Sequence, residues 1–157
     1  MALEDLLARC TFPPAGAALV CGVSGGADSL ALLVLAVAAG CEVTAVHVDH
    51  GLRPGSAAEA EVVAEAAWRR GASFRADVVR VEPGSNLEAR ARSARLAALG
   101  PEAALGHTAD DRAETMLVNL LRGAGLDGLA AMRTEGHPLL GLRRHETRRL
   151  CADLGLQ

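Results

Sequence analysis

Short apolar runs alternate with longer segments of helical periodicity along the whole chain. The apolar runs predict five β-strands, at residues 17–23, 41–48, 73–81, 103–106 and 138–142. Helical or capped segments lie at residues 2–9, after the first strand as far as residue 39, and at residues 56–70, 85–99, 109–122 and 143–154. Because most strands and helices alternate, we expect an α/β fold: an open, mostly parallel five-stranded sheet with helices on both faces.

Charges and prolines refine this arrangement. Arg75, Asp77 and Arg80 alternate through the third apolar run, which is typical of a strand at a sheet edge. Residues 1–16 read as an N-terminal helix followed by a connector that contains Pro-Pro. Residues 17–157 are then expected to form a single domain.

The turn after the first strand carries the clearest chemical signal. Its sequence is SGGADS, residues 24–29, between an apolar run and a helical pattern. Gly25 and Gly26 let the backbone approach a ligand closely, and the next helix directs its free N–H groups into the same gap. This geometry suits a phosphate group. Ser24 and Ser29 add hydroxyl donors, and the Asp28 carboxylate is a candidate metal ligand.

Two further polar segments follow predicted strands, at residues 47–53 and 107–111. In open parallel sheets, ligands bind beyond the carboxyl ends of the strands. The three segments are therefore expected to converge on one crevice. In the predicted helix 109–122, Asp111, Thr115 and Arg122 fall within about 40° of one another on one face. Asp111 also has a structural explanation, as the capping partner of Thr108.

Composition narrows the possible functions. All 16 basic residues are arginine, so a Walker A lysine and Schiff-base chemistry are excluded, and γ-phosphate transfer is disfavoured. The net charge is −3 and aromatic residues are scarce, so any contact with RNA must be a local patch. The four cysteines form no CxxC pair, the N-terminus lacks a basic signal region, and no apolar stretch is long enough to span a bilayer. We therefore expect a cytoplasmic protein without membrane association, whose oligomeric state, including a homodimer, stays open.

The SGGxDS pattern resembles the loop of the PP-loop family, the N-type ATP pyrophosphatases. Four more segments, in order, resemble the lysidine synthetase branch of that family: VHVDHGLR, NLEARARSARL, GHTADDRAETMLVNLLRGAGLDGLAAM and HPLLGLRR. The chain departs from the usual branch pattern at Leu96 (usually Tyr), Arg112 (usually Gln) and His137 (usually Arg). The arginine at position 112 would lie beside the acids and lower their pKa values.

The resemblance implies a two-step reaction. The C2 oxygen of the wobble cytidine in an isoleucine tRNA with a CAU anticodon attacks the α-phosphate of ATP, and pyrophosphate leaves. The amine of lysine then displaces AMP. ATP and Mg²⁺ are the implied cofactors, and the tRNA and lysine are the implied substrates. Family members usually continue into C-terminal tRNA-binding domains, so residues 17–157 are expected to be the adenylation domain without them.

The residues and the resemblance together give a set of predicted site residues. They are Asp28, Asp111 and Arg122 in catalysis; Ser24, Gly25, Gly26, Ala27, Asp28, Ser29, His47, His50 and His107 in the ATP site; Glu88 and Arg92 at the substrate; and Asp28 and Asp111 at the metal.

Two other interpretations stay open. One is a different PP-loop adenylating enzyme, either a tRNA thiolase or an amide-forming synthetase. Thiolases of this fold usually carry paired cysteines, which this chain lacks, and amidotransferases need a glutaminase partner. The other is a non-catalytic nucleotide-binding module, although binding alone needs fewer acids than this chain provides.

Overall fold

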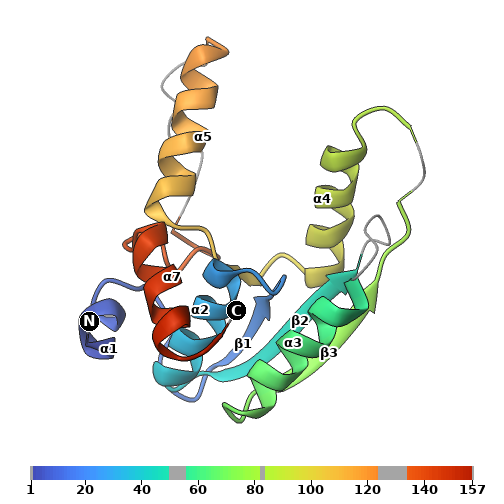
Figure 1. Cartoon of the computed structure of the whole chain (residues 1–157). Helices are drawn as coiled ribbons and strands as arrows, with labels where there is room; N and C mark the ends of the chain where they lie inside the picture. Colours follow the sequence, from blue (N-terminus) through green and yellow to red (C-terminus); the bar gives the residue numbers. More distant parts are fainter. Residues whose placement is uncertain (1, 50–55, 82–83, 124–133, 157) are drawn as a thin grey trace.

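The computed structural model describes residues 2–49, 56–81, 84–123 and 134–156 (Figure 1). In chain order the elements are α1 (Leu3–Leu7), β1 (Ala18–Gly22), α2 (Ala27–Ala38), β2 (Glu42–Asp49), α3 (Ser56–Trp68), β3 (Ser73–Val78), α4 (Leu87–Leu99), β4 (Ala104–Leu105), α5 (Ala109–Leu121) and α7 (Arg144–Asp153). None of the helices in these ranges combines the length and the apolarity needed to cross a bilayer.

The strands form a parallel sheet in the order β3-β2-β1-β4. In its register, Cys21 of β1 lies beside Ala45 of β2 on one side and Ala104 of β4 on the other. The α/β fold predicted from the alternating pattern is therefore confirmed. The third strand lies at an edge, where its charged residues reach solvent, as its sequence predicted.

The predicted fifth strand does not form: the described residues contain four strands. Residues 138–142 make successive turns instead, in which the N–H of Leu140 donates to the carbonyl of His137 (3.3 Å) and that of Leu142 to the carbonyl of Leu139 (2.9 Å). Pro138 has no N–H to give to a ladder. Leu139 and Leu142 are fully buried. The apolar run therefore reflects burial in the core rather than strand pairing.

Helices cover both faces of the sheet, as expected. One face packs on α2, whose residues 29–36 are all buried, and on α3. Helix α7 packs in turn on α2 rather than on the sheet. On the other face, Val46 and Val48 pack against Leu99 near the end of α4. The N-terminal helix α1 joins the first of these clusters through Leu6, which is 1% exposed.

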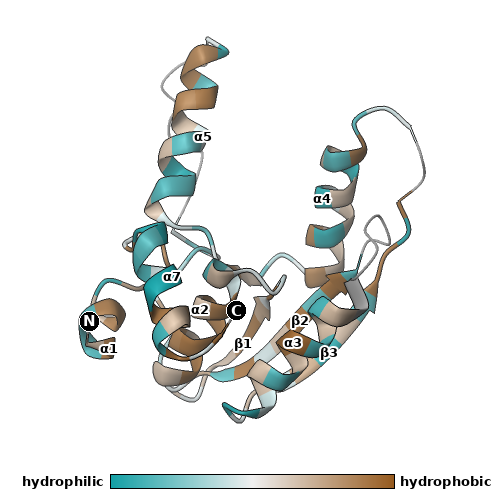
Figure 2. Cartoon of the chain, in the orientation of Figure 1, coloured by the Kyte–Doolittle hydropathy of each residue, from teal (hydrophilic) through white to brown (hydrophobic). Residues whose placement is uncertain are grey.

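Two helices rise from the side of the sheet where the strands end, α4 and α5 (Figure 1). The outer half of α5 is apolar and exposed (Figure 2): Leu117 is 59% exposed and Leu121 is 87% exposed. No described residue of α5 is buried. Only the first turns of α5 therefore lie near the body of the domain.

The end of β4 and the start of α2 touch through their backbones at Gly106. A Cβ atom on Gly106 would lie 2.7 Å from the carbonyl oxygen of Asp28 and 3.0 Å from the Cα of Ser29. Both of these atoms belong to backbone that cannot move without shifting α2. Only glycine fits here, and this contact fixes the spacing between two of the predicted site loops.

We predict that Gly106→Ala lowers the free energy of unfolding by about 1–3 kcal/mol, the usual range for overpacking. Urea unfolding followed by circular dichroism measures this change. Gly26→Ala is the matched control, because its backbone angles are ordinary (φ −74°, ψ 156°) and its Cβ would meet nothing nearer than the Ser24 Oγ at 3.8 Å. Equal stability of the two variants would contradict the prediction.

Candidate active site

The two serines of the SGGADS loop hold its shape. The Oγ of Ser29 accepts a hydrogen bond from the backbone N–H of Ser24 (3.1 Å) and donates one to the carbonyl of Gly26 (2.8 Å). Between them, Gly25 has φ +88°, a left-handed conformation that favours glycine. Ser29 is therefore a structural member of the loop as well as a candidate ligand contact.

The first turn of α2 opens at this loop without a side-chain cap. Its N-cap residue is Gly26, which has no side chain to accept from the first N–H groups of the helix. These N–H groups and the positive end of a 12-residue helix are available to a ligand. The sequence SGGADS thus produces an anion-binding helix terminus.

A cavity of about 610 Å³ lies over the loop, at the carboxyl ends of the strands. It is lined by β1 and the loop, the end of β2, one residue of α3, the end of α4, the segment after β4, and single residues of α5 and α7. The predicted site residues that line it are Ser24, Gly26, Ala27, Asp28, Ser29, His47, His107 and Asp111. The described parts of the three predicted polar segments therefore converge on one cavity, the second through residues 47–49 at the end of β2.

Other predicted residues lie elsewhere. Gly25 lines a smaller adjoining pocket of about 220 Å³. His50 lies outside the described residues. Glu88 and Arg92 are exposed on α4 and do not line the cavity. Arg122 is the C-cap of α5, about 16 Å along the helix from Asp111, so the structure does not bring it to the cavity. The roles of these residues stay predictions.

Asp111 combines the two roles that its sequence position suggested. One carboxylate oxygen, Oδ2, accepts hydrogen bonds from the backbone N–H (2.7 Å) and the hydroxyl (2.8 Å) of Thr108. The first of these bonds, together with one from the N–H of Asp111 to the Thr108 side chain, forms a capping box. The other oxygen, Oδ1, accepts from Arg144 Nη2 (2.9 Å). Capping α5 thus fixes the orientation of a carboxylate at the cavity.

The start of α7 supplies two partners that sequence reasoning missed. Arg144 contacts Asp111 and lies 3.9 Å, Nε to Oδ2, from Asp28. The hydroxyl of Thr147 donates to Asp28 Oδ1. The segment HPLLGLRR did resemble a family motif, but no periodic pattern links residues 144 and 147 to carboxylates more than 30 positions away. Only the packing of α7 beside α2 brings them together.

Arg95 is a third residue that sequence reasoning missed. It extends from α4 and lines the cavity, and its Nε is buried without a hydrogen-bond partner in the described structure. Burial, followed by the nearby charge of Arg92, lowers the pKa of Arg95. A buried guanidinium nitrogen without a protein partner is a donor that a ligand in the cavity can satisfy. The repeated arginines of NLEARARSARL were its only sequence signal.

Histidines support two edges of the cavity. His47 is 3% exposed, and its Nδ1–H donates to the carbonyl of Val23 (3.0 Å), which ties β2 to the residue before the loop. The Nδ1 atoms of His107 and His137 are 3.1 Å apart, and the rings meet edge to face. One of these two nitrogens must donate and the other must accept, so the pair is not fully protonated.

The sequence profile of the PP-loop domain matches residues 3–157. The chain belongs to the PP-loop family. The resemblance seen in the SGGADS loop is thereby confirmed.

This PP-loop domain is similar to several curated bacterial proteins named tRNA(Ile)-lysidine synthase. It is 54% identical to the protein of Nocardia farcinica over 92% of this chain and 48% of the relative. It is 47% identical to the protein of Rhodococcus erythropolis, over 88% of this chain and 46% of the relative. It is 46% identical to the protein of Mycobacterium tuberculosis, over 86% of this chain and 44% of the relative. The chain spans about half the length of the curated relatives it matches.

Solved structures also share the fold of this PP-loop domain. The U34-tRNA thiolase NcsA of Methanococcus maripaludis aligns with a TM-score of 0.72 at 18% identity, over 99% of this chain and 62% of that protein. The glutamine-dependent NAD⁺ synthetase of Acinetobacter baumannii aligns with a TM-score of 0.55 at 23% identity, over 98% of this chain and 31% of that protein. At these identities the likeness shows the fold alone.

Burial, hydrogen bonds and neighbouring charges set the protonation states of Asp111 and His107 in the cavity. Burial by itself would raise the pKa of Asp111, but hydrogen bonds from Thr108 and Arg144 outweigh it and hold that pKa below its ordinary value. Burial, followed by the positive charges of His137 and Arg92, lowers the pKa of His107 to about 4. At neutral pH the cavity therefore holds an ionised Asp111 and an uncharged His107.

The lowered pKa of His107 predicts a pH-dependent stability. The unfolded chain protonates this histidine near its ordinary pKa of about 6.5, whereas the folded chain resists protonation down to about 4. The unfolded state therefore gains more protons as the pH falls through this window, and about 1–3 kcal/mol of folding free energy is lost. Urea unfolding at pH 6.5, 5.5 and 4.5 measures the loss, which His107→Asn should reduce.

The exposed His145→Asn on α7 is the matched control and should keep the wild-type slope. Burial, followed by the charge of Arg92, also lowers the pKa of His137, whose ring contacts His107, so His137 contributes to the slope in the same window and His107→Asn should reduce the slope without abolishing it. Asp111 and Glu146 also have lowered pKa values, and their contribution is lost mainly at and below the acid end of the window, where the unfolded chain protonates its carboxylates. If His107→Asn also keeps the full wild-type slope, His107 is not the group responsible.

Proposed function

We propose that this PP-loop domain is the adenylating core of a tRNA(Ile)-lysidine synthase. One observation carries the proposal: a single cavity joins uncapped helix N–H groups to two carboxylates, Asp28 and Asp111. The names of relatives at 46–54% identity supply the substrates, an isoleucine tRNA and lysine. The proposed place of action is the cytoplasm, where these substrates are found.

The reaction begins with ATP in this cavity. The N–H groups at the start of α2 bind the phosphates, and Arg95 and Arg148, which also line the cavity, offset their negative charge. The C2 oxygen of the cytidine then bonds to the α-phosphorus, and the bond to the β-phosphate oxygen breaks. The departing pyrophosphate stays close to the loop, whose amides need no reorganisation to receive its charge.

Mg²⁺ fits the carboxylates at the edge of the cavity. Asp28 and Asp111 offer oxygen ligands and lie on either side of one guanidinium, that of Arg144. Mg²⁺ characteristically binds one or two carboxylates together with substrate phosphates. The described residues contain no cluster of three metal-ligating side chains. When bound with ATP, Mg²⁺ neutralises charge that develops on the phosphates.

The tRNA nucleotide is proposed to approach along α4. Glu88, Arg92 and Arg95 are spaced i, i+4 and i+7, so they share one face of the helix. Arg95 lies at the inner end of this row, in the cavity, and the other two are exposed farther out. A row of this kind contacts both the reacting nucleotide and the adjoining backbone phosphates.

The cysteines disfavour a thiolase function. Burial raises the pKa of Cys21 to about 12, and burial is also the main cause that raises the pKa values of Cys10 and Cys151 to about 11. Thiols with such pKa values are poor nucleophiles at neutral pH. None of the four cysteines lines the cavity. Sulfur transfer therefore lacks a reactive thiol near the nucleotide site.

We predict that Asp28→Asn abolishes pyrophosphate release and keeps the fold. The assay contains ATP, Mg²⁺, lysine and an isoleucine tRNA with a CAU anticodon, and it follows both pyrophosphate and lysine incorporation. Asparagine still accepts the Thr147 hydrogen bond but loses the charge, so a fall on the order of a hundredfold or more is expected.

The matched control for this assay is Asp153→Asn, at the exposed end of α7, which should turn over normally. Pyrophosphate release without lysine transfer would mean that this chain carries out only the first step, adenylation of the cytidine. Tight ATP binding without pyrophosphate release under any substrate condition would contradict an enzymatic function. Unchanged turnover of Asp28→Asn would remove Asp28 from the proposed site.

A further inference from the structure

The guanidinium of Arg144 lies among three carboxylates from two helices. Its Nη2 donates to Asp111 Oδ1 at 2.9 Å, its Nη1 donates to Glu114 Oε1 at 2.9 Å, and its Nε is 3.9 Å from Asp28 Oδ2. Asp28 lies in the first turn of α2, whereas Asp111 and Glu114 lie in the first turns of α5. One side chain of α7 thus bridges both helices at the edge of the cavity.

Backbone contacts hold Arg144 in this position. Its own N–H donates to Asp110 Oδ2 at 2.9 Å. The hydroxyl of Thr147, one turn later, shares its single proton between the carbonyl of Arg144 (2.8 Å) and Asp28 Oδ1. Nearby, the N–H of Ala109 donates to the carbonyl of Leu142 at 2.8 Å. These bonds fix the start of α7 against the starts of α2 and α5. They therefore hold the backbone of Arg144 at a position from which its side chain reaches the carboxylates.

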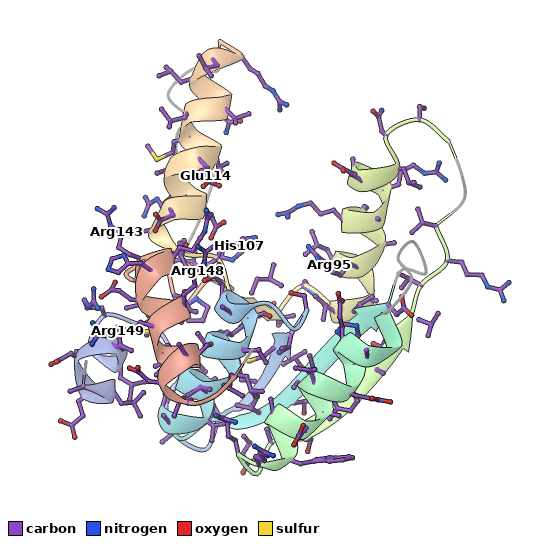
Figure 3. The ribbon with its side chains drawn as sticks, viewed as in Figure 1. Arg95, His107, Glu114, Arg143, Arg148 and Arg149 are labelled. Atoms are coloured by element: carbon purple, nitrogen blue, oxygen red, sulfur yellow. The ribbon has the colours of Figure 1, made fainter. Side chains whose placement is uncertain are left out.

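Other arginines of α7 lack this environment. Arg143 and Arg149 lie on the side of the helix that faces away from α4 (Figure 3). Arg149 is 68% exposed, and its ion pair with Asp153 spans 3.9 Å. Arg148 lines the cavity but has no ion pair with any described residue. Among these residues, Arg144 is the one placed between the proposed metal-binding carboxylates.

A guanidinium and a divalent cation compete for the same carboxylate charge. Each is attracted to Asp28 and Asp111, and each repels the other at such short range. The metal alone therefore meets carboxylates whose negative charge Arg144 already neutralises in part. When ATP binds, its phosphates add several negative charges, and the site then accommodates both cations.

We propose that Arg144 is a positioning residue that occupies the carboxylate pair in place of the metal and makes Mg²⁺ binding dependent on ATP. This inference rests on the proposed function, which assigns Asp28 and Asp111 to the metal. The ionic hold on the carboxylates keeps them oriented toward the cavity before the nucleotide arrives. The guanidinium also disfavours binding of a free metal ion to these carboxylates when ATP is absent.

The test measures the affinity of Mn²⁺ alone, by electron paramagnetic resonance, and then in the presence of a non-hydrolysable ATP analogue. We expect Arg144→Met to bind Mn²⁺ alone about tenfold more tightly than wild type, because three carboxylates lose their cation. The gain in Mn²⁺ affinity on adding the analogue should shrink by a similar factor. Arg144→Lys retains the charge and should stay close to wild type, and Arg149→Met is the matched control that should change nothing.

Circular dichroism establishes that each variant is folded, and Arg144→Gln, which keeps a polar side chain, replaces the methionine variant if that one unfolds. Weaker or unchanged Mn²⁺ binding in the neutral variants would overturn the inference. An increase in affinity is the informative result, because replacing a residue that only supports the fold does not strengthen metal binding. Failure of the metal site itself looks different: Asp28→Asn and Asp111→Asn would then leave Mn²⁺ binding with the ATP analogue unchanged.

Discussion

Burial of α2 between the sheet and α7 is the constraint that gives the cavity its form. Residues 29–36 of this helix are all buried, so its axis cannot shift without breaking the main core. The N-terminus of α2 is thereby fixed at the carboxyl ends of the strands, and Gly106 lets β4 end directly against it. The phosphate-binding loop is a consequence of core packing: the helix that forms the core also presents its free N–H groups to the ligand.

The charged groups on the two sides of the cavity differ in whether they have partners: the acids beside α7 have them, and an arginine beside α4 does not. On the side of α7, Asp28 and Asp111 are satisfied by Arg144, Thr147 and Thr108. On the side of α4, the Nε of Arg95 has no hydrogen-bond partner among the described residues. In the proposed function, ATP lies between these sides, where its phosphates meet the arginine and add negative charge beside the acids that are proposed to hold Mg²⁺.

Much of the fold followed from local patterns. Alternating apolar and helical segments predicted parallel βαβ units, and the charges of the third apolar run placed β3 at the edge. The pattern misled at residues 138–142, because a buried turn and a buried strand have the same apolar composition. Pro138 was the available signal, since it cannot donate to a strand ladder.

The sequence by itself determined the phosphate loop, the strand ends that converge on it and the Thr108–Asp111 cap, because each depends on neighbouring residues or on the direction of parallel strands. Tertiary structure alone decided which charges meet. Arg144 reaches Asp28 and Asp111 across 116 and 33 positions because α7 packs on α2, and Arg122 lies far from them because α5 extends outward. Helical periodicity gives the face on which a side chain lies, but the packing of the helix decides what that face contacts.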